Sequence, residues 1–149
     1  MNKTPDGTYK VPVIPIERIR TILPYFESVS AGFPSPADDY VEEKLSLDRY
    51  LIKNPASTFF LRVSGTSMTG AGIYPNDILI VDRSLEPKNK DVVIALIDGE
   101  LTVKRFIKAN NKFYLKPENP DFKPIEIPQD REFMIWGVIT NVIHKPYEL

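Results

Sequence analysis

The stretch that decides the fold reads Val92-Val93-Ile94-Ala95-Leu96-Ile97-Asp98-Gly99-Glu100-Leu101-Thr102-Val103-Lys104-Arg105-Phe106. Its first six residues form an apolar run of the length of a strand. Asp98-Gly99 supplies a two-residue turn, because glycine adopts a positive φ without steric cost. Residues 101–106 return as a second strand, so the stretch predicts an antiparallel hairpin.

Further short apolar runs, separated by turn residues, predict the remaining strands. They cover residues 58–63, 78–81, 112–115, 125–127 and 133–143. The 14 prolines are spread along the chain and disfavour long helices. We therefore expect a mainly β fold, a short-stranded β-sandwich or partly closed barrel.

Only short helices are expected. Ser35 and Pro36 suit the N-cap and N1 positions of a helix over residues 36–44. Residues 47–52 are expected to add one more turn before Asn54-Pro55 ends it. Before these helices, residues 1–35 are predicted to form an extended arm, because prolines recur in it. Residues 36–149 would then form the β-rich domain.

The composition excludes several classes of function. A length of 149 residues suits one domain, and a net charge of −1 gives no electrostatic reason to bind nucleic acid phosphates. The chain has no cysteine and one histidine, so we expect no disulfide, no cysteine nucleophile and no zinc site, and no cofactor is implied. No apolar run approaches the ~20 residues that span a bilayer, and no signal peptide is visible, which favours the cytoplasm.

Ser67 is the first candidate for chemistry. It lies in Val63-Ser64-Gly65-Thr66-Ser67-Met68, just after a predicted strand, where a nucleophile would be exposed. The backbone N–H groups of Ser67 and Met68 would be able to stabilise an oxyanion. An ordinary glycine-rich turn with a solvated serine explains the same residues. The segment is not the G-x-S-x-G elbow of α/β-hydrolases, because position 69 is threonine.

Lys104 is the second candidate, 37 residues after Ser67. Strand alternation puts it on one face with Thr102 and Phe106, where partial burial would lower its pKa. A neutral Lys104 amine would then take the proton of Ser67. The alternative is an exposed strand lysine that pairs with an acid.

Ala31-Gly32 is the third candidate, as a bond between small residues in the arm that a narrow cleft would accept for cleavage. An ordinary hinge is the alternative. His144 is expected to be structural or solvated, although a serine–histidine–acid triad stays open. Three aspartates are expected to serve as turn residues: Asp77, Asp82 and Asp98.

Ala31-Gly32, Ser67 and Lys104 follow one another in the chain in this order. With these features the chain resembles the LexA-like serine peptidase family, and within it the UmuD-like group. The resemblance runs from Ala31 to His144. It rests on residues 31–42, 63–68, 76–82 and 98–104. Thr66 departs from the family pattern, which commonly has an acidic residue there, and the arm before Ala31 shows no detailed likeness.

The resemblance implies a homodimer that cuts its own arm between Ala31 and Gly32, with Ser67 as the nucleophile and Lys104 as the base. It implies that RecA filaments on single-stranded DNA promote the cut in the SOS response to DNA damage. The shortened protein would then join a Y-family, UmuC-like polymerase subunit in translesion synthesis. The family's repressors carry a DNA-binding domain, and the 31 residues before the presumed cut disfavour repression.

Rival interpretations remain open at this point. The alternative to the peptidase is a non-catalytic binding module for a polymerase or RecA, with a vestigial serine–lysine pair. A signal-peptidase-like hydrolase shares the chemistry but needs a membrane anchor, which the sequence lacks. Direct DNA binding is disfavoured by the net charge.

Overall fold

Nine strands form two antiparallel sheets in the part of the chain described by the computed structural model, residues 22–26, 42–130 and 132–146. The chain divides into two units, Met1–Ser46 and Leu47–Leu149. The expected boundary between residues 35 and 36 lies outside the described residues and stays a prediction.

The first unit contains a two-stranded sheet. Strand β1 (Leu23–Phe26) pairs antiparallel with β2 (Glu42–Leu45), with Leu23 opposite Leu45. The helix expected over residues 36–44 is therefore wrong for residues 42–44, and the rest of it lies outside the described residues. Glutamate, lysine and leucine favour a helix locally, but pairing with a strand from elsewhere in the chain overrides that weak preference.

The second unit begins with α1 (Leu47–Leu51), which confirms the helical turn expected there. A seven-stranded sheet follows, in the order β3-β4-β9-β5-β6-β7-β8, and all neighbours run antiparallel. Its strands are β3 (Thr58–Arg62), β4 (Ile78–Asp82), β5 (Val92–Ile97), β6 (Glu100–Ala109), β7 (Lys112–Lys116), β8 (Ile125–Glu126) and β9 (Phe133–Ile143). One-turn 3-10 helices occupy Pro55–Ser57 and Thr69–Ala71.

The predicted mainly β fold is confirmed, and each predicted strand is present. Strand β6 extends three residues beyond its predicted end. Strands β3 and β8 are the two ends of the sheet and do not pair with each other, so the described residues form no closed barrel. No helix among the described residues is long and apolar enough to cross a membrane.

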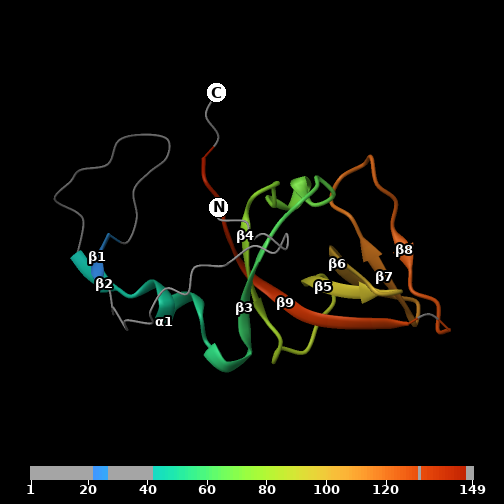
Figure 1. Ribbon diagram of the computed structural model, residues 1–149, viewed down its shortest axis with the longest axis horizontal. Coiled ribbons are helices and arrows are strands. Elements are labelled where there is room, and N and C mark those ends of the chain that lie inside the picture. Colours follow the sequence, from blue (N-terminus) through green and yellow to red (C-terminus); the bar gives the residue numbers. More distant parts are fainter. Residues whose placement is uncertain (1–21, 27–41, 131, 147–149) are drawn as a thin grey trace, which may run out of the picture. The chain divides into compact units, whose positions relative to one another are not determined.

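Strand β9 joins the two halves of the large sheet. Residues 138–143 pair with β4, and residues 133–138 pair with β5. In Figure 1 this orange-red strand runs from the group β5–β8 to β3 and β4. At the junction, a Cβ atom on Gly137 would lie 2.6 Å from the Cγ1 atom of Val81. Only glycine lets the two strands approach this closely.

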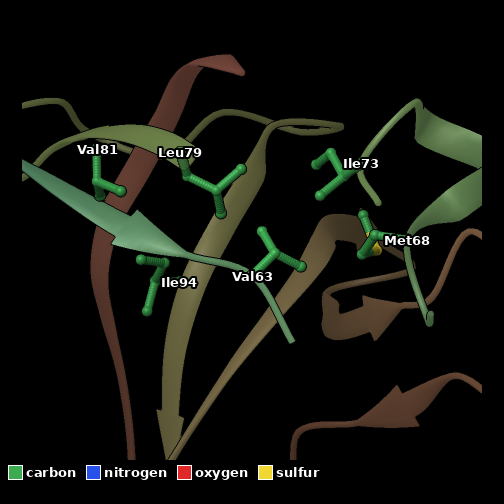
Figure 2. Close-up of a cluster of buried hydrophobic side chains, with 6 residues drawn as sticks. All are labelled: Val63, Met68, Ile73, Leu79, Val81 and Ile94. Atoms are coloured by element: carbon green, nitrogen blue, oxygen red, sulfur yellow. The ribbon is translucent and has the colours of Figure 1, made fainter. Parts of the chain in front are cut away.

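Two apolar clusters form the core, and β5 contributes to both. Ile94 belongs to the first cluster, whereas its neighbours Val93 and Ala95 belong to the second. Because side chains alternate along a strand, β5 is buried on both faces, which explains its unbroken apolar sequence. Figure 2 shows the first cluster, whose side chains converge between β3, β4 and β5: Val63, Met68, Ile73, Leu79, Val81 and Ile94. The second consists of Val93, Ala95, Phe106, Leu115 and Val138.

Candidate active site

A tight hairpin positions Lys104. Asp98 and Gly99 have φ values of 48° and 83°, and Ile97 lies opposite Glu100, as in a two-residue turn with positive φ at both positions. The hairpin fixes the register of β6 on β5, so that Lys104 lies opposite Val93. The predicted hairpin is thereby confirmed.

The loop after β3 positions Ser67. Val63 and Met68 are buried in the first cluster on either side of it, and Ser67 itself is half-buried. Gly65 and Gly72 have positive φ values of 85° and 75°, which the turns on either side of Ser67 require. The two buried side chains thus anchor a loop whose backbone turns sharply, and the serine lies between the anchors.

The structure brings Ser67 and Lys104 together. The Nζ atom of Lys104 lies 2.9 Å from the Oγ atom of Ser67. The same nitrogen lies 2.8 Å from the Oγ1 atom of Thr102 and 3.0 Å from the carbonyl oxygen of Val103. A neutral amine has two N–H donors and one lone pair. With the donors given to Thr102 and Val103, the lone pair is available for the Ser67 hydroxyl proton.

Burial lowers the pKa of Lys104 from its usual 10.5. Burial disfavours the charged form of an amine because water no longer solvates it. Among the described residues, no carboxylate forms an ion pair with Lys104 that would oppose the shift. The site therefore favours the neutral amine that a general base requires.

Two backbone donors belong to Ser67 and to the residue after it. Among the described residues, the N–H groups of Ser67 and Met68 donate no hydrogen bond to a backbone oxygen. The next residues differ, because the Thr69 N–H donates to the Thr66 carbonyl and the Gly70 N–H donates to the Glu118 carbonyl. Unused N–H groups next to a nucleophile are the donors that an oxyanion needs.

Ser67 and Lys104 line one cleft of about 240 Å³. Its other lining residues come from the end of β3, the loop that follows it, the middle of β5 and the beginning of β6. They include the apolar side chains of Leu61, Val63, Met68, Ile94, Leu101 and Val103. Apolar side chains therefore lie in the cleft around Ser67 and Lys104.

A segment after β7 holds the serine loop in place. The Glu118 N–H donates to the Ser67 carbonyl at 2.9 Å, and the Glu118 carbonyl accepts from the Gly70 N–H at 2.7 Å. The Asn119 side chain donates to the Thr66 carbonyl at 2.9 Å. A Cβ atom on Gly70 would lie 2.5 Å from the Glu118 oxygen, so glycine is needed for this contact. We call these contacts of Glu118 and Asn119 with residues 66–70 the clamp, and Thr66 contributes to it through its backbone carbonyl.

His144 contacts Asp77, and the Nδ1 atom of His144 lies 2.7 Å from the Oδ1 atom of Asp77. Asp77 is buried, and its other carboxylate oxygen accepts a hydrogen bond from the Tyr74 N–H at 2.8 Å. The hydroxyl of Ser67 has Lys104 as its partner instead. The geometry therefore favours the lysine over the histidine as the partner of Ser67.

Asp82 has a structural role. Burial raises the pKa of its carboxyl, but hydrogen bonds from Asn54, Ser84 and Ser57 outweigh burial and lower it to about 2. Asp98 occupies the hairpin turn, as expected. Among the described residues, no group of three His, Cys, Asp or Glu side chains is placed to hold a metal ion.

Local sequence patterns indicate some of these residues and not others. Strand alternation puts Thr102 on the face of Lys104, but it indicates no role for the threonine. Glu118 and Asn119 carry no local signal, because their contacts with the serine loop depend on the path of the chain after β7. The proposed cleavage site, Ala31-Gly32, lies outside the described residues.

Comparison with known proteins identifies a family and several relatives of this chain. Residues 24–140 match the family described as Peptidase S24-like. The chain is 47% identical over 131 residues to Protein ImpA of Salmonella typhimurium, covering 86% of this chain and 88% of that protein. It is 45% identical to Protein SamA of Salmonella typhimurium, covering 87% and 90% of the two chains.

A third relative belongs to the repressors. The chain is 39% identical over 127 residues to LexA repressor 1 of Geobacter sulfurreducens, covering 85% of this chain and 62% of the repressor. Together these matches confirm the resemblance to the UmuD-like group of LexA-like proteins. The chain therefore belongs to the peptidase S24-like family of serine peptidases.

Proposed function

We propose that this protein is a serine–lysine peptidase that cuts its own chain between Ala31 and Gly32. The observation that carries the proposal is the 2.9 Å distance between the Lys104 Nζ and Ser67 Oγ atoms, at a lysine whose pKa is lowered by burial. Membership of a peptidase family supports the class of reaction. The choice of Ala31-Gly32 rests on the sequence alone.

In the first step, neutral Lys104 removes the hydroxyl proton of Ser67. The Ser67 Oγ atom forms a bond to the carbonyl carbon of Ala31, whose oxygen becomes negative. The N–H groups of Ser67 and Met68 stabilise this oxyanion by hydrogen bonding. Thr102 and Val103 keep the Lys104 amine in place during the transfer, because each accepts one of its N–H groups.

In the second step, the bond between Ala31 and Gly32 breaks. Protonated Lys104 gives its proton to the departing nitrogen of Gly32, and Ala31 stays attached to Ser67 as an ester. Lys104 is neutral again and takes a proton from water, which attacks the ester. The products are a carboxylate at Ala31, a free amino group at Gly32 and the regenerated serine.

The resemblance to UmuD-like and LexA-like proteins supports the proposed role in the cell. We place the cut in the cytoplasmic SOS response, where a RecA filament on single-stranded DNA favours the docked arm by a population shift. The cleaved protein acts as a homodimer and as the accessory subunit of a Y-family, UmuC-like polymerase in translesion synthesis. Tethering of the arm supplies a high local concentration of the scissile bond.

The test is the intact mass of the purified protein after incubation at pH 10. The expected result is a fragment that begins at Gly32, formed by the wild type and absent from the Ser67→Ala variant. Substitution of a serine outside the cleft, Ser84→Ala, is the matched control and should leave cleavage unchanged. The hydroxyl of Ser84 donates to Asp82 and does not line the cleft.

The opposite result would favour the second function. If the mass of the wild type stays unchanged at pH 10 and also with RecA, nucleotide and single-stranded DNA, the peptidase proposal is wrong. The protein would then be a non-catalytic binding module for a polymerase or RecA. A fragment with a different first residue would retain the chemistry and reject Ala31-Gly32.

A further inference from the structure

An ion pair connects the strand of the base to the loop of the nucleophile. Arg105, the residue after Lys104, donates from its Nε atom to the Oε1 atom of Glu118 at 2.5 Å. A second nitrogen of the same guanidinium donates to the Lys90 carbonyl at 2.7 Å. The side chains of Arg105 and Glu118 are 26% and 23% exposed, so the pair is partly shielded from solvent. Arg105 is therefore held at two points, and Glu118 is held by Arg105.

The backbone of Glu118 extends this connection to Ser67. Its N–H and carbonyl groups hydrogen-bond to Ser67 and Gly70, which lie on either side of Met68. The chain of contacts is short: Lys104 is covalently next to Arg105, Arg105 binds Glu118, and Glu118 binds Ser67. Strand β6 thus carries the base directly and holds the nucleophile through one intermediary residue.

We propose that Arg105 and Glu118 are positioning residues that keep the Ser67 hydroxyl within hydrogen-bond distance of the Lys104 amine. This inference rests on the proposed function, because it concerns the rate of the same reaction. Neither residue touches the reacting atoms. Their effect is geometric, and a displacement of about 1 Å between reacting groups lowers a rate by about 100-fold.

The ion pair between Arg105 and Glu118 is needed in addition to the backbone hydrogen bonds of Glu118 to hold the serine loop. Residues 118–119 lie between β7 and β8, outside any helix or strand. The two hydrogen bonds of the Glu118 backbone therefore fix the serine loop only if Glu118 itself is fixed. The paired carboxylate does this, because a charge-assisted hydrogen bond to arginine is stronger and more directional than a neutral one.

The experiment measures the first-order rate of self-cleavage between pH 7 and 11 in the full chain. Glu118→Gln keeps the volume of the side chain and removes its charge. We expect a plateau rate at high pH that is about 10- to 100-fold lower than in the wild type, with an unchanged midpoint of the pH profile. Arg105→Lys keeps the charge but loses the two-point contact, and should lower the plateau in the same way.

The midpoint of the profile distinguishes positioning from general loosening. If Glu118 only supported the fold, its substitution would admit water to Lys104 and move the midpoint up toward pH 10.5. The control is Glu126→Gln, which removes the Lys112–Glu126 pair between β7 and β8. Those side chains are 56% and 49% exposed, and the plateau should change less than twofold.

Amide hydrogen exchange tests the clamp without relying on cleavage. The Gly70 N–H, which donates to the Glu118 carbonyl, should exchange faster in Glu118→Gln and at the wild-type rate in Glu126→Gln. If the wild-type protein never cleaves itself, the proposed function is wrong. The exchange rate of the Gly70 N–H would then still decide whether the Glu118 side chain holds the serine loop in place. Unchanged exchange at Gly70, an unchanged plateau, or a lower plateau with a raised midpoint would each overturn the positioning role. If Glu118→Gln does not fold, the same measurements on Arg105→Lys decide.

Discussion

The Nζ atom of Lys104 and the Oγ atom of Ser67 lie 2.9 Å apart, although 37 residues separate them in the chain. One belongs to the β5–β6 hairpin and the other to the loop that follows β3. Their contact depends on a packed core between these elements, since Val63 and Met68 cluster with Ile94. The reactive geometry is therefore a product of the tertiary fold.

Lys104→Met should abolish self-cleavage and leave the fold intact. The thioether fills a volume similar to that of the lysine stem but accepts no proton from Ser67. The measurement is the intact mass at pH 10 together with circular dichroism. A cleaved Lys104→Met protein would exclude Lys104 as the base.

Thr102→Val should slow self-cleavage by about 10-fold. The isosteric side chain removes one acceptor of the Lys104 amine. Because a protonated amine makes the stronger hydrogen bond, this loss should also move the midpoint of the pH profile to lower pH. The control is Thr140→Val, whose hydroxyl contacts the Ile80 carbonyl in another part of the sheet. Equal effects of the two variants would show that the Thr102 contact has no specific role.

The lowered pKa of Lys104 should appear as a pH dependence of stability. The unfolded lysine has a pKa near 10.5 and the folded one a lower value, so the unfolded state binds more protons between the two. Stability should therefore rise with pH through this window. In a Ser67→Ala background, which prevents cleavage, the variant with Lys104→Met should be more stable at pH 7, and the difference should shrink toward pH 10.5. Urea unfolding at several pH values measures it, and parallel curves would contradict it.

Asp82→Asn should destabilise the fold by about 1–3 kcal/mol at pH 7, because buried donors lose a charged acceptor. The carboxyl has a pKa of about 2 when folded and 3.8 ordinarily. Its contribution is present above pH 3.8 and is lost as the pH falls toward 2. Thermal unfolding at pH 7 and pH 2 checks both statements. A constant difference between wild type and variant across this range would show that the contacts of Asp82 do not depend on its charge.

Gly70→Ala should slow self-cleavage more than it lowers the melting temperature. The added Cβ atom would lie 2.5 Å from the backbone oxygen of Glu118, so the loop must move away from its clamp. Gly70 is exposed, which limits the cost to the core. Gly72→Ala is the comparison, because Gly72 does not line the cleft, its Cβ atom meets nothing within 4 Å and the change only strains a positive φ. Similar rates for both variants would argue against the clamp.

Much of the large sheet could be predicted from local patterns. The hairpin at Asp98-Gly99 and the apolar run of β5 are visible because turn chemistry and burial on two faces leave a direct trace in the sequence. Local preference predicts a helix where β2 forms, because its partner β1 is about 20 residues away and the local sequence carries no trace of that pairing.

The residues of the candidate site likewise divide into those that local sequence patterns indicate and those that only the tertiary structure brings together. Ser67 and Lys104 could be selected from residue type and neighbours, and Thr102 from strand alternation. Arg105 and Glu118 could not, because a charged pair on a sheet is ordinary in sequence and acquires a role only when the loop after β7 reaches Ser67. Contacts between loops depend on chain paths that no periodicity encodes.

The place of β9 in the sheet has a consequence for the newly made protein. Ribosomes synthesise β3 and β4 early, then β5 and β6, and β9 after all of them. Since β9 alone links β4 to β5 in the sheet order, the backbone hydrogen bonds of the large sheet are complete only when it is in place. If the chain cuts itself as proposed, we expect the sheet that supports Ser67 and Lys104 to be complete only after this final strand emerges. The order of the strands in the chain would thus determine when the large sheet is complete.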